Sequence, residues 1–196
     1  MRKESKFSIK DLVLLGAMNA VLVILYYLVI MLLHLIPPLW GFIDPVVNLV
    51  LVPVYALMLR LIPKMFVMTI HGAIIGAIHI AIGWWPGLFA GIIGGLAADL
   101  TACFLGGYSR PRAVIAGVCV YTTVKAMLFY APLYLFVFAP VFQEVVSTWP
   151  QESLDLFSGL FPVIFLALNL AASLTGLKLG QKLISRHFVQ TGAIAQ

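Results

Sequence analysis

The stretch 12–33, LVLLGAMNAVLVILYYLVIMLL, contains no charged side chain. An α-helix of this length rises about 33 Å at about 1.5 Å per residue, enough to cross the ~30 Å hydrocarbon core of a bilayer. The run is longer than the roughly 7–15 apolar residues of a signal peptide, and no small-residue cleavage site follows it at His34–Pro38. The stretch therefore predicts a transmembrane helix that is retained in the mature protein.

The composition of the whole chain agrees with this prediction. Hydrophobic residues make up 63% of the 196 residues and charged residues 10%, against about 45–50% and about 25% in soluble domains. A soluble domain of this size could not bury so much apolar surface. We expect an all-α, polytopic membrane protein: one integral membrane domain over residues 1–196, with six transmembrane helices in a compact bundle at about 12–33, 43–62, 65–83, 87–107, 113–139 and 158–181.

Basic residues are distributed unevenly between these spans. Eleven of the twelve precede the first span, lie at or between the ends of spans two and three or of spans four and five, or lie at or beyond the end of the sixth: Arg2, Lys3, Lys6, Lys10, Arg60, Lys64, Arg110, Arg112, Lys178, Lys182 and Arg186. The connections 34–42, 84–86 and 140–157 contain none. Because Lys and Arg are retained on the cytoplasmic side, we expect both termini in the cytoplasm of a bacterial cell membrane. Topology and anionic lipid then explain the net charge of +5, and no basic patch indicates nucleic-acid binding.

Small residues recur at four-residue spacing, a pattern that lets helix backbones approach closely in lipid. In the third, fourth and sixth spans they indicate packing inside the bundle: Gly72, Gly76, Gly87, Gly91, Gly95, Ala172, Gly176 and Gly180. In the first span, Gly16 and Ala20 lie near the cytoplasmic end on either side of Asn19. For this pair, packing within the bundle and contact with a helix of another subunit are both open.

Polar side chains inside the spans are costly in lipid and count as functional candidates. They are Asn19, Asn48, His71, His79, Asp99, Lys125 and Asn169, with His34, Trp40, Asp44, Trp84 and Trp85 in loops or at boundaries. Asp99 lies ~12 Å and Lys125 ~18 Å from the cytoplasmic ends of their spans, at ~1.5 Å per residue. Lys125 could therefore pair with Asp99, or face a cavity and hold an anionic or carbonyl group of a ligand.

The outer end of the third span offers a second group of candidates. His79 lies four residues from that end, beside Trp84 and Trp85, and could form a hydrogen bond with a ligand in the outer half of the bundle. The two tryptophans fit equally a headgroup aromatic belt and a stacking role. Asn169, near the middle of the sixth span, needs a partner inside the bundle, either a ligand or another helix. His71 lies deeper, on the cytoplasmic side, and fits a packing role.

Enzyme motifs are missing from the chain. It has no GxSxG elbow, HExxH zinc site, Walker A loop or GxGxxG fingerprint. Asp99 is the single aspartate deep in the bundle, so the paired aspartates of an intramembrane protease are missing too. Cys103 and Cys119 match no metal-ligand spacing. We expect no catalysis, metal or cofactor, and any active transport needs another subunit or an ion gradient.

Residues 60–132 resemble a known family. They begin RLIPKMFVMTIHGAIIGAIHIAIGWWPGLFAGIIGGLAADLTACFLGGYSRPR (60–112) and continue into the span that holds Lys125. The Pro-Lys turn, the glycine-spaced third span ending in Gly-Trp, the acid in the inner half of the fourth span and the Gly-Gly-Tyr-Ser-Arg turn are similar to the Trep_Strep group of bacterial membrane proteins. This group resembles the substrate-binding S-components of energy-coupling factor (ECF) transporters.

The resemblance implies a non-catalytic six-helix subunit that captures a vitamin or other micronutrient from outside. Such a subunit works with a transmembrane coupling subunit and two cytosolic ATPases. The docking motif of the family, Ala-x-x-x-Ala on the first helix, falls on Gly16 and Ala20, with Gly in place of the first Ala. The ligand site lies in the outer half under the loop 34–44, which implies these substrate-binding residues: Lys125, Asn169, His79, Trp84, Trp85 and Trp40.

A function of a different class stays open. A stand-alone secondary carrier or channel could use Asp99, Lys125 and His79 as an ion or proton relay. An S-component should co-purify with coupling and ATPase subunits, whereas a carrier should transport alone.

Overall fold

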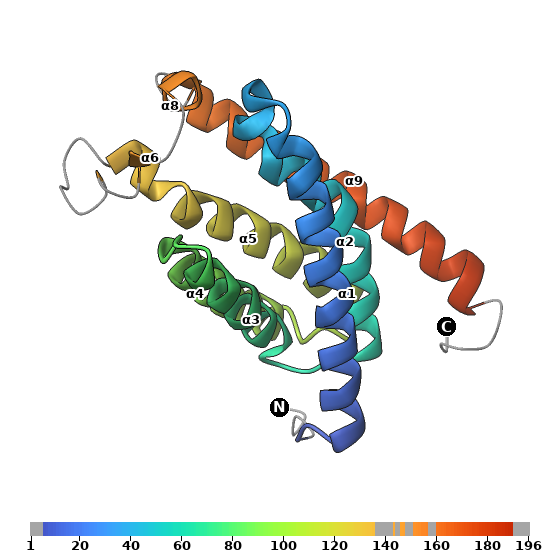
Figure 1. Ribbon diagram of the computed structural model, residues 1–196. Helices are drawn as coiled ribbons and strands as arrows, with labels where there is room; N and C mark the ends of the chain where they lie inside the picture. Colours follow the sequence, from blue (N-terminus) through green and yellow to red (C-terminus); the bar gives the residue numbers. More distant parts are fainter. Residues whose placement is uncertain (1–5, 136–142, 144–145, 148–150, 157–159, 190–196) are drawn as a thin grey trace.

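The computed structural model describes residues 6–135, 143, 146–147, 151–156 and 160–189, and this part of the chain contains helices and turns but no strand. In chain order the helices are α1 (Ile9–His34), the 3₁₀-helix η1 (Pro37–Phe42), α2 (Ile43–Leu61), α3 (Val67–Ala81), α4 (Pro86–Phe104), α5 (Pro111–Phe129), α6 (Ala131–Leu135), α8 (Gln151–Leu156), α9 (Phe161–Leu183) and the π-helix η2 (Ile184–Val189). Helices α1 and α2 cross the more inclined α5 and α9 (Figure 1).

Five helices in the described part of the chain are long and apolar enough to cross a membrane: α1, α2, α4, α5 and α9, the last counted to Arg186. Helix α3 is a shorter apolar helix. The predicted all-α, polytopic membrane fold is therefore confirmed.

Helix α1 begins at a capping box. Ser8 Oγ accepts a hydrogen bond from Asp11 N at 3.2 Å, and Asp11 Oδ2 accepts one from Ser8 N at 2.7 Å, so two N–H groups at the helix start are satisfied. Asp11 also forms an ion pair with Lys64 at 2.6 Å, which ties the start of α1 to the α2–α3 connection. Much of the remaining surface of α1 is apolar and exposed: Leu12, Val13, Val21, Ile24, Leu28, Met31 and Leu32.

Helices α3 and α4 form an antiparallel pair in which the backbones touch. A Cβ atom at Gly72 would lie 2.0 Å from the carbonyl oxygen of Gly91, and one at Gly91 would lie 2.1 Å from that of Gly72. A Cβ at Gly95 would lie 2.5 Å from Met68 O. Only glycine permits this approach, so the predicted packing role of the small residues is confirmed here.

Close contacts at glycine positions also join α9 to α2. A Cβ at Gly176 would lie 2.9 Å from Val52 Cβ, and one at Gly180 would lie 2.8 Å from Pro53 Cα. Both helices run in the same direction along this contact. The packing role predicted for the sixth span is therefore also confirmed.

The predicted bounds differ from those of the structure by up to three residues at the ends of most spans, and two of the differences have a clear local cause. Helix α5 ends at Phe129 rather than continuing to 139, because Pro132 has no N–H to donate to the carbonyl four residues earlier and its ring crowds that turn. The chain resumes as α6, and residues 136–139 lie outside the described part. Helix α3 begins only at Val67, since Phe66 has a φ of +68°, and the predicted span 65–83 shortens to 15 helical residues.

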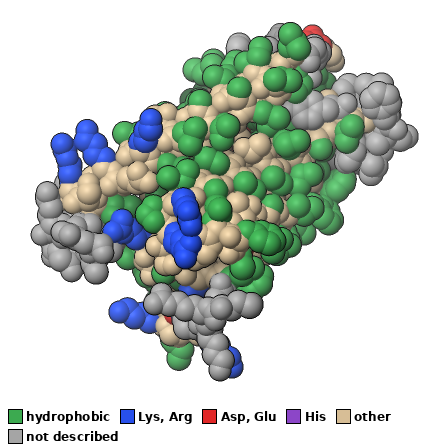
Figure 2. Space-filling model, turned by 180° about the vertical axis from the view of Figure 1, so that it is seen from behind, with side chains coloured by type: hydrophobic (Ala, Val, Ile, Leu, Met, Phe, Trp, Pro, Cys, Tyr) green, Lys and Arg blue, Asp and Glu red, His purple; other side chains and the backbone are tan. Residues whose placement is uncertain are grey.

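The basic side chains lie toward one end of the bundle. Figure 2 shows Lys and Arg side chains gathered at one end, while hydrophobic side chains cover most of the visible surface. This end holds the start of α1, the α2–α3 and α4–α5 connections and the end of α9. The side of the membrane on which it lies stays a prediction.

Candidate functional site

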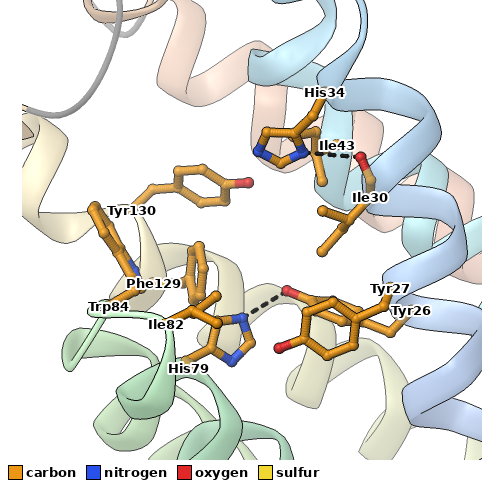
Figure 3. Close-up of a pocket in the computed structure, with 10 residues that line it drawn as sticks. All are labelled: Tyr26, Tyr27, Ile30, His34, Ile43, His79, Ile82, Trp84, Phe129 and Tyr130. Atoms are coloured by element: carbon orange, nitrogen blue, oxygen red, sulfur yellow. Dashed lines mark hydrogen bonds between the residues drawn. The ribbon is translucent and has the colours of Figure 1, made fainter.

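A cavity of about 260 Å³ opens at the opposite end of the bundle, away from the basic side chains. Its walls come from α1, the first residue of α2, the end of α3, the α3–α4 turn and the end of α5 (Figure 3). The lining residues are Tyr26, Tyr27, Ile30, His34, Ile43, His79, Ile82, Trp84, Phe129 and Tyr130. A mostly apolar pocket with a few oriented polar groups is the usual form of a small-molecule site.

Aromatic rings form one wall of this cavity. The Trp84 and Phe129 ring centroids lie 5.6 Å apart with the planes tilted by 37°, and Phe129 also packs edge-on against Tyr130 and His79. Trp84 is 8% exposed, whereas its neighbour Trp85 is 37% exposed. Two adjacent tryptophans that the sequence could not distinguish therefore have different surroundings, and only the first lines the cavity.

His79 is held by two hydrogen bonds. Its Nδ1 lies 2.8 Å from Ile75 O and its Nε2 lies 2.8 Å from the Tyr26 hydroxyl. Because a carbonyl oxygen can only accept, Nδ1 carries the hydrogen, and in the neutral ring Nε2 accepts from Tyr26. This contact joins α1 to α3 across the cavity (Figure 3).

A buried ion pair lies next to the cavity. Lys125 Nζ on α5 donates to Asp44 Oδ1 on α2 at 3.0 Å, and the side chains are 6% and 2% exposed. The Lys125 ammonium also lies 5.7 Å from the Tyr26 ring centroid and 5.8 Å from that of Phe129, both cavity residues. Asp44 Oδ2 is buried and has no hydrogen-bond partner among the described residues. Neither Lys125 nor Asp44 is itself a lining residue.

The alternative in which Lys125 pairs with Asp99 is wrong, because Lys125 pairs with Asp44. Asp99 on α4 accepts hydrogen bonds from Thr69 N at 2.9 Å, Thr69 Oγ1 at 2.6 Å, Met68 N at 3.4 Å and Tyr108 Oη at 2.8 Å. Met68 and Thr69 lie in the first turn of α3, whose N–H groups have no partner within the helix. Asp99 therefore caps α3 from a neighbouring helix, and its charge also complements the helix dipole.

Tyr108, in the α4–α5 connection, completes this cap. Burial and the Asp99 carboxylate both raise the pKa of its hydroxyl, so the phenol stays protonated and donates.

Asn169 lies in a separate polar cluster between α2, α5 and α9. It accepts a hydrogen bond from Asn48 Nδ2, and its own Nδ2 donates to Thr122 O at 2.9 Å. Ser173, one turn further along α9, donates to Thr122 Oγ1 at 2.9 Å. Asn169 does not line the cavity, so the helix-to-helix alternative describes its present contacts, and its part in ligand binding stays a prediction.

His71 joins three helices inside the bundle. Its Nδ1 lies 2.7 Å from Asn19 Oδ1 on α1, and its Nε2 lies 3.2 Å from the Tyr55 hydroxyl on α2. All three side chains are buried, in agreement with the packing role expected for His71.

Gly16 and Ala20 lie on the exposed side of α1, away from the buried side that holds Asn19 and Tyr26. Both are exposed, and a Cβ at Gly16 would have no heavy atom within 4 Å. Packing of this pair against the described residues of the chain is therefore not observed, and its contact with another subunit stays a prediction. The side chain of Trp40 lies outside the described part of the structure.

Several lining residues were missed by the sequence, chiefly Tyr26, Tyr27, Phe129 and Tyr130. They carry no charge and sit in apolar runs, where aromatic residues are ordinary, so no signal distinguished them. A signal for Asp44 was present in the sequence. An isolated lysine in the membrane needs a counter-charge, and Asp44 is the single acidic residue near the predicted outer boundary of spans two to five.

Comparison with known proteins places the chain in a family. The model of the Trep_Strep family, described as a hypothetical bacterial integral membrane protein, matches residues 9–190. No curated protein and no solved structure matches the chain. Because the match covers all the helices of the bundle, the chain belongs to the Trep_Strep family of bacterial integral membrane proteins.

Proposed function

We propose that the chain is the substrate-binding S-component of an ECF-type importer. In this role it is non-catalytic, binds a vitamin or similar micronutrient from outside, and delivers it with a transmembrane coupling subunit and two cytosolic ATPases. The observation that carries the proposal is the aromatic cavity at the end of the bundle away from the basic side chains. With the basic end in the cytoplasm, the cavity faces outward and both termini lie inside.

The exposed stripe of α1 supports the part of the proposal that concerns the partner. Gly16 and Ala20 present backbone and small side chains at the surface, and no atom of the described residues lies within 4 Å of a Cβ built at Gly16. Small residues at this spacing permit close contact between helices in lipid. A helix of the coupling subunit is the occupant we propose.

The alternative of a stand-alone carrier has less support. Its relay would connect Asp99 with Lys125 and His79, but Asp99 is engaged by the first turn of α3 and by Tyr108. Lys125 instead forms its ion pair with Asp44. An acid used as a helix cap is a poor relay group, since releasing it exposes the N–H groups that it satisfies.

The test is co-purification from cells that also express the coupling subunit and the two ATPases. Wild-type protein should retain all three partners, whereas Gly16→Leu should lose them because its branched side chain blocks a close helix contact. Gly16→Ala is the matched control and should retain them. Normal retention by Gly16→Leu contradicts the docking role, and failure of the wild type to retain the partners contradicts the proposed function.

A further inference from the structure

The cavity has a size that suits a particular kind of ligand. At about 260 Å³ it exceeds the roughly 150 Å³ apolar cavity that admits benzene. Space of this order accommodates one or two fused six-membered rings. It is too small for a long or bulky ligand unless the walls move.

The walls are shaped for a flat molecule. Of the described lining residues, seven carry an aromatic or imidazole ring: Tyr26, Tyr27, His34, His79, Trp84, Phe129 and Tyr130. Such rings prefer offset-stacked or edge-to-face contacts with other rings, which add binding energy beyond burial alone. Trp84 and Phe129 lie against each other with their ring planes tilted by 37°, so together they form a continuous aromatic surface on one side of the cavity. Hydroxyl and ring nitrogen atoms among these residues favour a guest that carries heteroatoms.

The charge of the site argues against an ionised ligand. The described residues that line the cavity include no Lys, Arg, Asp or Glu. The nearest charges, Lys125 and Asp44, already neutralise one another. An ionised guest would lose water without gaining a free counter-charge, which is strongly unfavourable.

We propose that the cavity binds a flat, uncharged heteroaromatic molecule of one to two fused rings, packed against the wall that Trp84 and Phe129 form. This inference rests on the proposed function, which supplies the reason for a ligand to enter, and it specifies the chemical class of that ligand.

Three pairs of matched probes test the charge and the flatness of the proposed ligand by calorimetric titration of the isolated protein in nanodiscs, with empty nanodiscs as the blank. The pair 2-methylquinoline and N-methylquinolinium tests positive charge at constant size. Quinoline-2-carboxamide and quinoline-2-carboxylate test negative charge, and 2-naphthol and decahydro-2-naphthol test flatness. We expect each neutral probe to bind at least about tenfold tighter than its charged partner, and the flat naphthol about three- to tenfold tighter than the saturated one.

Two variants locate the binding. Phe129→Leu keeps an apolar side chain but removes the ring, and it should weaken 2-naphthol about three- to tenfold with little effect on decahydro-2-naphthol. Phe89→Leu, on the exposed face of α4, is the control and should change neither. If Phe129→Leu does not fold, titration of the three probe pairs against the wild-type protein still tests the ligand class.

The proposal is overturned if either charged probe binds as tightly as its neutral partner, or if decahydro-2-naphthol binds as tightly as 2-naphthol. It is also overturned if no neutral aromatic probe binds. These outcomes are distinct from failure of the proposed function. Co-purification with the importer subunits does not depend on the probes. The docking result can therefore stand when the proposed ligand class fails, and the ligand class can stand when co-purification fails.

Discussion

Replacing Lys125 by methionine should strongly destabilise the protein. Methionine keeps much of the apolar volume of the lysine side chain but removes the ammonium, so the Asp44 carboxylate is left buried without its partner. Removing one partner of a buried ion pair reduces the free energy of unfolding by about 3–5 kcal/mol. Water screens this pair little, because both side chains are almost fully buried.

The double change should restore much of that stability. Asp44→Asn removes the uncompensated charge, so Lys125→Met with Asp44→Asn should unfold within about 1 kcal/mol of the wild type, since replacing both members of a buried pair is often neutral. The assay is reversible unfolding of the purified protein in mixed micelles, followed by tryptophan fluorescence, for the wild type, both single variants and the double variant. The double-mutant cycle should therefore show a large favourable interaction energy, because each single change leaves a buried charge unpaired and the double change leaves none.

Asp99→Asn provides the decisive control. Combined with Lys125→Met it should add a further loss of stability, because Asp99 caps α3 and makes no ion pair with Lys125. Rescue of Lys125→Met by Asp99→Asn, together with no rescue by Asp44→Asn, would refute the assigned pairing.

Three further outcomes follow from the packing and the topology. Asp99→Ala should lower the free energy of unfolding by about 1–3 kcal/mol through loss of the α3 cap, with the affinity for the best neutral probe unchanged in titration; a changed affinity contradicts a purely structural role. Gly91→Ala should lower the free energy of unfolding by about 1–3 kcal/mol in the same assay, because its Cβ would lie 2.1 Å from a carbonyl oxygen. The control Gly16→Ala should be neutral or slightly stabilising. Equal effects of the two substitutions would argue against the backbone contact at Gly91. Cysteines at Gln151 and Lys182 should react with a membrane-impermeant reagent from outside and inside respectively, and labelling of both from one face would contradict the topology.

The spans were predictable because the thickness of the bilayer sets a length that the sequence must match. The run 12–33 lies within α1, and the second predicted span differs from α2 by a single residue at its end. The glycine spacing also predicted the close helix contacts correctly, since Gly72 and Gly91 have no room for a larger side chain. In both cases a local pattern carries the physical constraint, so no knowledge of neighbouring helices was needed.

The polar pairings were not predictable, because depth gives only one of the three coordinates of a side chain. Lys125, ~18 Å from the basic end of a ~30 Å core, lies nearer the opposite boundary, where Asp44 lies in the first turn of α2. Asp99 lies nearer the basic end, where the Lys125 side chain could also have reached. Choosing between them needs the rotation of each helix and the order of its neighbours, neither of which the sequence specifies.

The Lys125–Asp44 pair has no sufficient explanation in stability alone. Charged residues at the centre of a membrane helix are each unfavourable by about 2.5–3.5 kcal/mol on insertion scales, and apolar residues of similar volume often serve a buried site at least as well as an ion pair. Its position offers another reason, since the Lys125 ammonium lies within reach of the faces of Tyr26 and Phe129. Cation–π contacts of this kind favour a fixed ring orientation. The pair therefore sits where it can hold two rings of the cavity wall in place, and a wall that is already ordered loses less entropy when a flat ligand enters.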